Sequence, residues 1–478
     1  MKKILYILAL VLMFAGCSSS EDRSHLLKVY NWADYIDEDL LDEFEQWYKD
    51  ETGEDVEIIY QTFDINETML SKIELGHEDY DVVCPSDYII ERMLANDLLL
   101  PLERDFGETP DYIGNVAPYI VEKFNQIEGN GKNANDYSVG YMWGTVGLIY
   151  NPKYISDSEV KDWDVLKNPA YAGKVLMKDA FRDVYTALLV ALNKDDIDSG
   201  TADLVSLPFD TSEKSISLVE NYLNSFKESI AGWEADFGKE QMTKELAWIN
   251  LSWSGDAQWA IDEAAEIGMD LRYSIPNEGS VVWFDGWVIP RYAKNTKAAR
   301  YFINYMCMPE NALRNMDITG YVSAIGGNEI LENMSDSESY EHLDASYFFG
   351  HEADSVCVNP IMYPDKKTIE RCAMMHDSGS RTEALLAMWS RVKGDNLNNW
   401  MVIVILLAIG VMIVVGIIRK IKQRRQRRRP LYDHRPRDLG GYGRECGYFR
   451  GRYRYRRHHH RHRKVSERAE SRRTGCGH

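Results

Sequence analysis

The chain has 478 residues, 45% of them hydrophobic, which is enough for two or three domains with buried cores. Its formal net charge is −20, so most of its surface is expected to attract cations and not anions such as nucleic acids.

The N-terminal segment predicts export from the cytoplasm. Lys2 and Lys3 precede an apolar run over 4–15, and Phe14-Ala15-Gly16-Cys17 is similar to the cleavage site of bacterial lipoproteins. We therefore expect a lipoprotein signal peptide over 1–16, a lipid on Cys17 and a polar tether over 17–25. An ordinary signal peptide cut nearby, with Cys17 incidental, is the alternative.

Residues 26–393 alternate strand-like and helix-like patterns. Strands are predicted over 26–30, 56–60 and 80–83, and a helix that starts at Asp37 or Asp39 and ends at Gly53 separates the first two. A second helix is predicted over 67–75. This repetition is typical of an α/β fold with a largely parallel sheet, in which ligands bind at the loops after the carboxyl ends of strands.

Aromatic residues and carboxylates occupy those predicted loops. Trp32 and Asp34 follow the first strand, Ser86 and Tyr88 follow the third, and Asp285 follows a strand-like run over 280–283. Carboxylates bind ammonium groups through charge-assisted hydrogen bonds, while aromatic faces attract cations and pack against methylene chains. The pattern predicts capture of an organic cation. The alternative for each aromatic residue is packing in the core.

No catalytic motif is found. The sequence has no nucleophile elbow, phosphate loop, dinucleotide fingerprint or His-Glu-x-x-His motif, and the histidines of the body are scattered. We expect a binding protein and not an enzyme, with no cofactor and no metal site. Cys357 and Cys372 either pair as a disulfide in an oxidising compartment or remain buried thiols.

The C-terminal part predicts a membrane anchor. Residues 400–418 form a run of 19 residues without a charged side chain. As a helix it would be roughly 29 Å long, at about 1.5 Å per residue, which is close to the thickness of the bilayer hydrocarbon core. A basic cluster starts at Arg419, and basic residues stay on the cytoplasmic side of membrane spans. A buried core helix is the alternative.

Residues 419–478 hold 22 Lys and Arg against 5 Asp and Glu, with few aliphatic residues. Such a segment cannot bury a core, so we expect a disordered basic tail in the cytoplasm, close to anionic lipid. Its alternation of Arg and Tyr over 452–455 would suit RNA, but no recognition motif accompanies it and no nucleic-acid partner is expected.

Several short blocks in the body lie in a specific order and spacing. They are Val29-Tyr30-Asn31-Trp32-Ala33-Asp34-Tyr35, Asn66-Glu67-Thr68-Met69, Asp81-Val82-Val83-Cys84-Pro85-Ser86, Tyr141-Met142-Trp143-Gly144, Trp253-Ser254-Gly255-Asp256, Trp283-Phe284-Asp285, Ile289-Pro290 and Gly320-Tyr321. Through them the chain resembles, over about residues 26–390, the spermidine/putrescine-binding proteins of bacterial ABC transporters. The resemblance implies two α/β lobes joined by crossing strands, the periplasmic-binding-protein fold, with the ligand in the cleft.

The resemblance also implies roles for individual residues. The aromatic box would consist of Trp32, Tyr35, Trp253, Trp283 and Tyr321. The polar contacts would be Asp285 at a terminal ammonium with Asp256 as its partner, Ser86 and Tyr88 at the other end, and Asp34 and Asp183 as negative charge there.

The sequence departs from the family at several of these positions. Spermidine-preferring members tend to have Thr-Glu at Ala33-Asp34, Ser at Asp256 and an acidic residue at Ala180, and a glutamine contact aligns near Met375. Asp34 and Asp256 are more similar to the putrescine-preferring members. The loss of an acid at Ala180 removes a partner for a central secondary ammonium.

We therefore expect an extracytoplasmic receptor that captures putrescine or spermidine and delivers it to an ABC permease at the periplasmic face of the inner membrane. The first lobe would comprise residues 26–143 and 286–330, and the second 144–285 and 331–393. A membrane-anchored polyamine sensor, and the same fold binding another small cation, are the alternatives.

Overall fold

The computed structural model describes residues 23–235 and 237–394, together with Gly410 and Met412. Contacts divide the chain into two units, Met1–Val402 and Ile403–His478, and the fold described below belongs to the first. Within the described residues, no helix has the length and apolar character needed to cross a membrane. The predicted signal peptide, Cys17, most of the predicted span over 400–418 and the basic tail lie outside the described residues.

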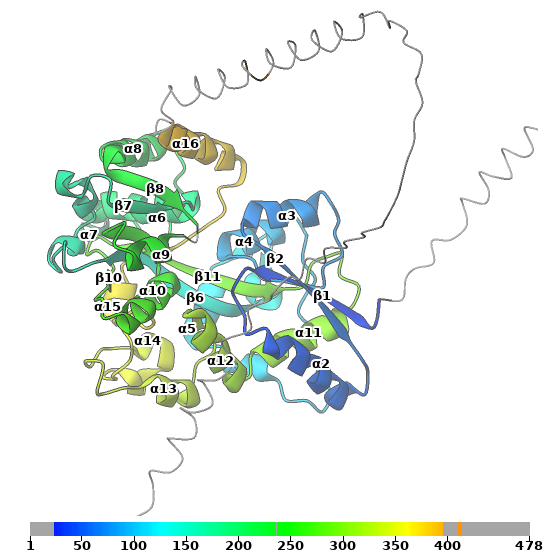
Figure 1. Cartoon of the computed structure of the whole chain (residues 1–478). Helices are drawn as coiled ribbons and strands as arrows, with labels where there is room; N and C mark the ends of the chain where they lie inside the picture. The colour runs from blue at the N-terminus through cyan, green and yellow to red at the C-terminus, as the bar shows by residue number, and fades with distance from the viewer. Residues whose placement is uncertain (1–22, 236, 395–409, 411, 413–478) are drawn as a thin grey trace, which may run out of the picture. The chain divides into compact units, whose positions relative to one another are not determined.

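A mixed sheet connects two lobes of the α/β body, with strand order β2-β1-β3-β11-β6-β9-β7-β8. The two long strands β6 (Ser138–Tyr150) and β11 (Ser280–Val288) pair antiparallel at its centre, and every residue of both is buried. Figure 1 shows them running from the side that carries β1, β2 and α2 to the side that carries β7 and β8. These crossing strands confirm the two-lobed architecture expected from the sequence.

The first lobe is a parallel α/β unit. In it β1 pairs in parallel with both β2 and β3. Its elements are β1 (Leu26–Trp32), α2 (Asp39–Thr52), β2 (Glu57–Phe63), α3 (Asn66–Glu74), β3 (Val82–Val83), α4 (Asp87–Ala95), α5 (Pro118–Phe124), β4 (Glu128–Gly129), β5 (Lys132–Asn133), α11 (Thr296–Met306), α12 (Pro309–Thr319) and β12 (Val322–Ser323).

The second lobe repeats this arrangement, because β7 pairs in parallel with both β8 and β9. The other elements around it are β7 (Val175–Lys178), α6 (Phe181–Leu192), α7 (Lys194–Asp198), α8 (Glu213–Asn224), β8 (Ile230–Glu234), α9 (Gly238–Thr243), β9 (Ile249–Trp253), α10 (Ser254–Glu266), β10 (Arg272–Ser274), α14 (Ser346–Phe349), α15 (Lys366–Ile369), β13 (Cys372–Met374) and α16 (Thr382–Gly394). Helix α13 (Asn328–Met334) contributes Ile330 to the core that β1 and α2 form in the first lobe.

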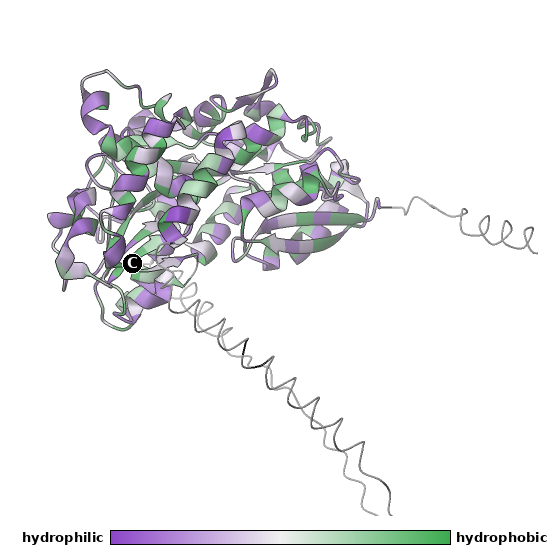
Figure 2. Cartoon of the chain, turned by 90° about the horizontal axis from the view of Figure 1, so that it is seen from above, coloured by the Kyte–Doolittle hydropathy of each residue, from purple (hydrophilic) through white to green (hydrophobic). Residues whose placement is uncertain are grey.

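Local sequence patterns account for the helices. In α2 the apolar residues recur at helical spacing, so that Leu40, Leu41, Phe44 and Tyr48 all face the core. The helix ends at Gly53, whose φ of 74° is the left-handed conformation that glycine adopts without strain. Coloured by hydropathy, the helices around the body alternate hydrophilic and hydrophobic residues (Figure 2), as amphipathic surface helices do.

The sheet differs from the sequence-based expectation in one respect. It is mixed and not largely parallel, because β6 and β11 run antiparallel to each other and β6 also runs antiparallel to β9. The early strand–helix alternation describes each lobe correctly but contains no information on the strands that cross between the lobes. Of the two states left open for Cys357 and Cys372, the structure contains buried free thiols.

Candidate ligand-binding site

The carboxyl ends of the first lobe's parallel strands carry several of the predicted site residues. Trp32 is the last residue of β1, and Tyr35 follows in the next loop. After β3 the chain reaches Ser86 and Tyr88 at the start of α4, and both are buried. Because neighbouring parallel strands end at the same edge of the sheet, these side chains lie on one wall of the site.

The second lobe presents a matching set at its own strand ends. The parallel strands β7, β8 and β9 end at Lys178, Glu234 and Trp253, respectively, and Lys178 is the register partner of Glu234. The helices that follow start at once, which places Asp183 in the first turn of α6 and Asp256 in the first turn of α10. A helix N-terminus stabilises such carboxylates.

Asp285 lies within β11 and not on a loop after it, because the strand continues to Val288. The pairing of β11 with β6 shifts between Asp285 and Gly286, which marks a bulge. Asp285 is 5% exposed, and its Oδ2 accepts a hydrogen bond of 2.8 Å from the Tyr35 hydroxyl. Its Oδ1 is buried and has no hydrogen-bond partner among the described residues.

Three aromatic rings adjoin this carboxylate. The ring of Tyr321 packs edge-on against Tyr35 and Trp283, with centroid separations of 5.2 and 5.5 Å. Gly255 makes room for Tyr321, since a Cβ there would lie 2.3 Å from the ring. Gly144 does the same for Trp283, with 2.6 Å to the indole. The rings therefore form a packed apolar wall beside the unpaired oxygen.

Trp253 and Asp183 form a second contact within the site. The indole Nε1–H of Trp253 donates a hydrogen bond of 2.9 Å to Asp183 Oδ1. Burial raises the pKa of Asp183 to about 6, although the bond from Trp253 acts in the opposite direction. Burial likewise raises the pKa of Asp285 to about 7. Both carboxylates would ionise more readily beside a cation.

Asp256, by contrast, already has a cationic partner from the chain itself. Lys178 Nζ lies 2.5 Å from Asp256 Oδ2 and 3.3 Å from Glu234 Oε1. The hydroxyl of Tyr321 donates to Asp256 Oδ1 at 3.0 Å. Burial raises the pKa of Asp256, but the charges of Lys178 and Lys239 outweigh it and the pKa is lowered overall.

Most of the predicted site residues meet in this buried region, and two lie at its margin. Trp32 is half-buried against Phe63, with ring centroids 4.5 Å apart. Asp34 is exposed and adopts a left-handed φ of 52° in the loop after β1. The residues brought together are Tyr35, Ser86, Tyr88, Asp183, Trp253, Asp256, Trp283, Asp285 and Tyr321.

Sequence reasoning missed several polar residues of the site. Asn66 Nδ2 donates to both Ser86 Oγ and the Tyr88 hydroxyl, at 3.0 and 3.1 Å. Lys178 and Glu234 were also missed. Each stands at the end of an apolar, strand-like run, so the strand-end argument that identified Trp32 could have found them.

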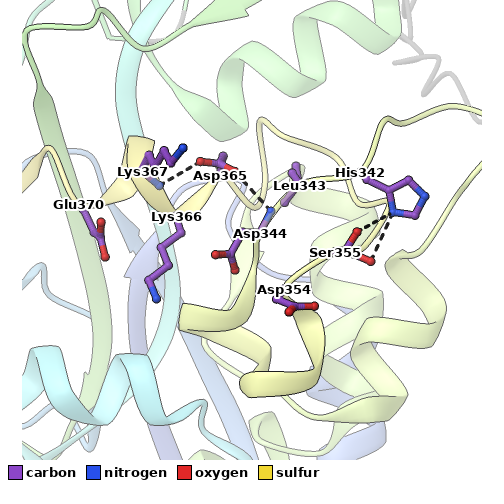
Figure 3. A pocket seen from close by; sticks show the side chains of 9 residues that line it. All are labelled: His342, Leu343, Asp344, Asp354, Ser355, Asp365, Lys366, Lys367 and Glu370. Atoms are coloured by element: carbon purple, nitrogen blue, oxygen red, sulfur yellow. Dashed lines mark hydrogen bonds between the residues drawn. The ribbon is translucent and has the colours of Figure 1, made fainter.

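A surface pocket of about 480 Å³ lies elsewhere in the body, lined by residues between His342 and Glu370, and Figure 3 shows these side chains. Its lining mixes acidic residues such as Asp344, Asp354 and Glu370 with Lys366 and Lys367. Its described lining residues include His342 but no Trp, Tyr or Phe, so it lacks the large aromatic faces that the buried site provides.

The fold and a family comparison define the class of protein to which the chain belongs. The profile of the bacterial extracellular solute-binding protein family matches residues 39–329, and the chain belongs to this family. Among curated relatives, it is 25% identical over 390 residues to the spermidine/putrescine-binding periplasmic protein of Escherichia coli, covering 81% of this chain and 97% of that protein. It is 27% identical over 328 residues to the putrescine-binding periplasmic protein PotF of the same organism, covering 66% and 82%.

Solved structures of solute-binding proteins share the fold of this chain. The spermidine/putrescine ABC transporter substrate-binding protein PotD of Streptococcus pneumoniae superposes with a TM-score of 0.56 at 28% identity, over 77% of this chain and 99% of that one. The TpPotD lipoprotein of Treponema pallidum superposes with a TM-score of 0.57 at 21% identity, over the same shares of the two chains, which shows the common fold.

Proposed function

We propose that the chain is an extracytoplasmic receptor, and not an enzyme, that captures a polyamine and delivers it to an ABC permease in the inner membrane. The observation that carries this proposal is Asp285 Oδ1, a buried carboxylate oxygen without a partner among the described residues. A ligand ammonium supplies both the charge and the hydrogen-bond donor that this oxygen needs. The relatives named for putrescine and spermidine support the choice of ligand.

The proposed ligand contacts follow from the site. Asp285 binds an ammonium group, and the rings of Tyr35, Trp283 and Tyr321 pack against the methylene chain. Ser86 and Tyr88 form hydrogen bonds with the ligand. The remaining proposed contacts are the rings of Trp32 and Trp253, the carboxylates of Asp34 and Asp183, and Asp256, whose charge Lys178 already balances.

We infer that the ligand enters by hinge motion between the lobes. The side chains around Asp285 are buried, so a ligand reaches them only when the lobes separate. We place the hinge in β6 between residues 143 and 144 and in β11 between residues 285 and 286, beside the bulge. The first lobe is then 26–143 with 286–330, and the second is 144–285 with 331–393.

We further propose, from the sequence, that the receptor is held at the periplasmic face of the inner membrane. The proposed anchors are a lipid on Cys17 and a membrane span over 400–418, with residues 419–478 in the cytoplasm. A receptor tethered in this way stays close to its permease.

Calorimetry tests the proposed function directly. The full-length protein, purified in detergent, is titrated with putrescine, cadaverine, spermidine and spermine, and with glutamate as an acidic control. We expect saturable binding of at least one amine and no binding of glutamate. The absence of binding by all four amines would show that the chain is not a polyamine receptor.

A further inference from the structure

A buried lysine of the chain lies among the aromatic and acidic residues of the candidate site. Lys178, the last residue of β7, is 1% exposed. Its Nζ lies 4.1 Å from the centroid of the Trp253 ring and within ion-pair distance of Asp256 and Glu234. An alkyl ammonium on an aromatic face between two carboxylates is the arrangement that binds an amine ligand.

The two carboxylates around Lys178 are already paired with cations and hydrogen-bond donors of the chain. Asp256 Oδ1 accepts from the Tyr321 hydroxyl and lies 3.5 Å from Lys239 Nζ. Glu234 Oε1 accepts from the Asn250 side-chain amide at 3.0 Å, and Oε2 accepts from the Gly238 backbone N–H at 3.1 Å. Two carboxylates and two ammonium groups make this four-residue cluster neutral, and Asp183, hydrogen-bonded to Trp253, lies next to it.

The other end of the site is different. Asp285 Oδ2 accepts one bond from Tyr35, while Oδ1 is buried without a partner in the described part of the chain. Tyr321 contacts both ends, since its hydroxyl binds Asp256 while its ring packs against Tyr35 and Trp283. A ligand along this ring therefore meets an unpaired carboxylate at one end and a neutralised cluster at the other.

We propose that Lys178 replaces one of the two ammonium groups of a diamine, so that the site prefers amines with one cationic end and an uncharged polar end. Amino alcohols and monoacylated diamines belong to this class. The inference rests on the proposed function and narrows its substrate class to singly charged relatives of the polyamines.

The proposed preference for singly charged amines arises from the free-energy cost of burying an unpaired charge. A second ammonium beside this cluster would lose its water and find Asp256 and Glu234 already paired, which leaves Asp183, bonded to the Trp253 indole, as its nearest other carboxylate. If Lys178 moved away from the site, a ligand ammonium could take its place. Asp256 and Glu234 would then remain buried with Lys239 as the only nearby lysine among the contacts described above. Burial disfavours the charged form of Lys178, but Asp256 and Glu234 outweigh burial and raise its pKa, so it stays protonated at neutral pH.

Two ligands of equal length test the proposal on the full-length protein. Putrescine has an ammonium at each end, and 4-aminobutan-1-ol replaces one of them with a hydroxyl. We expect calorimetry to show that the amino alcohol binds at least as tightly as putrescine. Tenfold tighter binding of putrescine would overturn the inference and leave the proposed function standing, whereas no binding of any amine would refute the proposed function itself.

A double variant tests the role of Lys178. Lys178→Gln with Glu234→Gln removes one charge of each sign, keeps polar side chains of similar length and frees Asp256 from its nearest cation. We expect the affinity for putrescine relative to the amino alcohol to rise at least tenfold. The matched control replaces both members of the surface pair Lys153–Glu245, whose charged atoms lie 3.0 Å apart, with Gln, and should leave the ratio unchanged.

An unchanged ratio in a folded Lys178/Glu234 double variant would overturn the assignment of Lys178. If that variant does not fold, as judged by circular dichroism, the comparison of the two ligands on the unmodified protein still decides the proposal, because it requires no substitution.

Discussion

The substitution Asp285→Asn removes the charge on which the proposed function depends while keeping the shape of the side chain. Asp285 is 5% exposed and interacts with the hydroxyls of Ser86 and Tyr35, so little water can replace the lost carboxylate beside a bound ammonium. Truncating one partner of a buried charge pair costs about 2–5 kcal/mol. The affinity for putrescine should therefore fall about 30-fold to several thousand-fold.

The same substitution should stabilise the ligand-free protein. Burial raises the pKa of Asp285 from 3.8 to about 7, which corresponds to about 4 kcal/mol against ionisation as an order of magnitude. Because the folded-state pKa lies above the unfolded value, this penalty is fully present above about pH 7 and disappears below about pH 4. At pH 8 the free energy of unfolding of the Asn variant should exceed that of the parent by about 1–4 kcal/mol.

Calorimetry at pH 8 measures the predicted loss of putrescine affinity, and urea denaturation at the same pH measures the predicted gain in stability. The matched control is Asp354→Asn, an exposed carboxylate in the surface pocket of Figure 3, which should change neither quantity. An Asp285→Asn protein that is folded and binds putrescine as tightly as the parent would show that the site is misplaced. An unchanged stability at pH 8 would show that Asp285 is not held in a desolvated position.

Further outcomes are expected. Between pH 8 and pH 5.5 the affinity for putrescine should fall roughly 30-fold as Asp285, with its pKa of about 7, takes up a proton, and calorimetry of Asp285→Asn should show a flatter profile. Gly255→Ala should destabilise the protein by about 1–3 kcal/mol in urea denaturation despite the better helix propensity of alanine, because the new Cβ meets the Tyr321 ring; a gain in stability would contradict this packing. Small-angle scattering should give a smaller radius of gyration with putrescine than without, and identical profiles would argue for a rigid site. In intact spheroplasts an impermeant maleimide should label Cys446 and Cys476 only after the membrane is opened; labelling from outside would exclude the predicted span.

Local patterns in the sequence determined the α/β character of each lobe. Apolar spacing over α2 and the glycine at position 53 were sufficient to predict that helix and its end, because helix periodicity and capping depend on neighbouring residues alone. The same reasoning placed Trp32 and Ser86 near strand ends. Strand length was less well predicted, since β3 contains two residues, Val82 and Val83, where four were expected.

The tertiary structure decided which charges face one another. Asp285 lies inside β11, and its environment depends on Tyr35, a residue 250 positions away in the sequence. The pairing of Lys178 with Glu234 and Asp256 depends on the register of β7 with β8 and on the parallel alignment of β9. Such contacts follow from the order of strands in the sheet, which short-range patterns do not encode. The sequence therefore identified acidic and aromatic residues suited to an amine, whereas the fold determined that one carboxylate remains free and another is neutralised by the chain's own lysine.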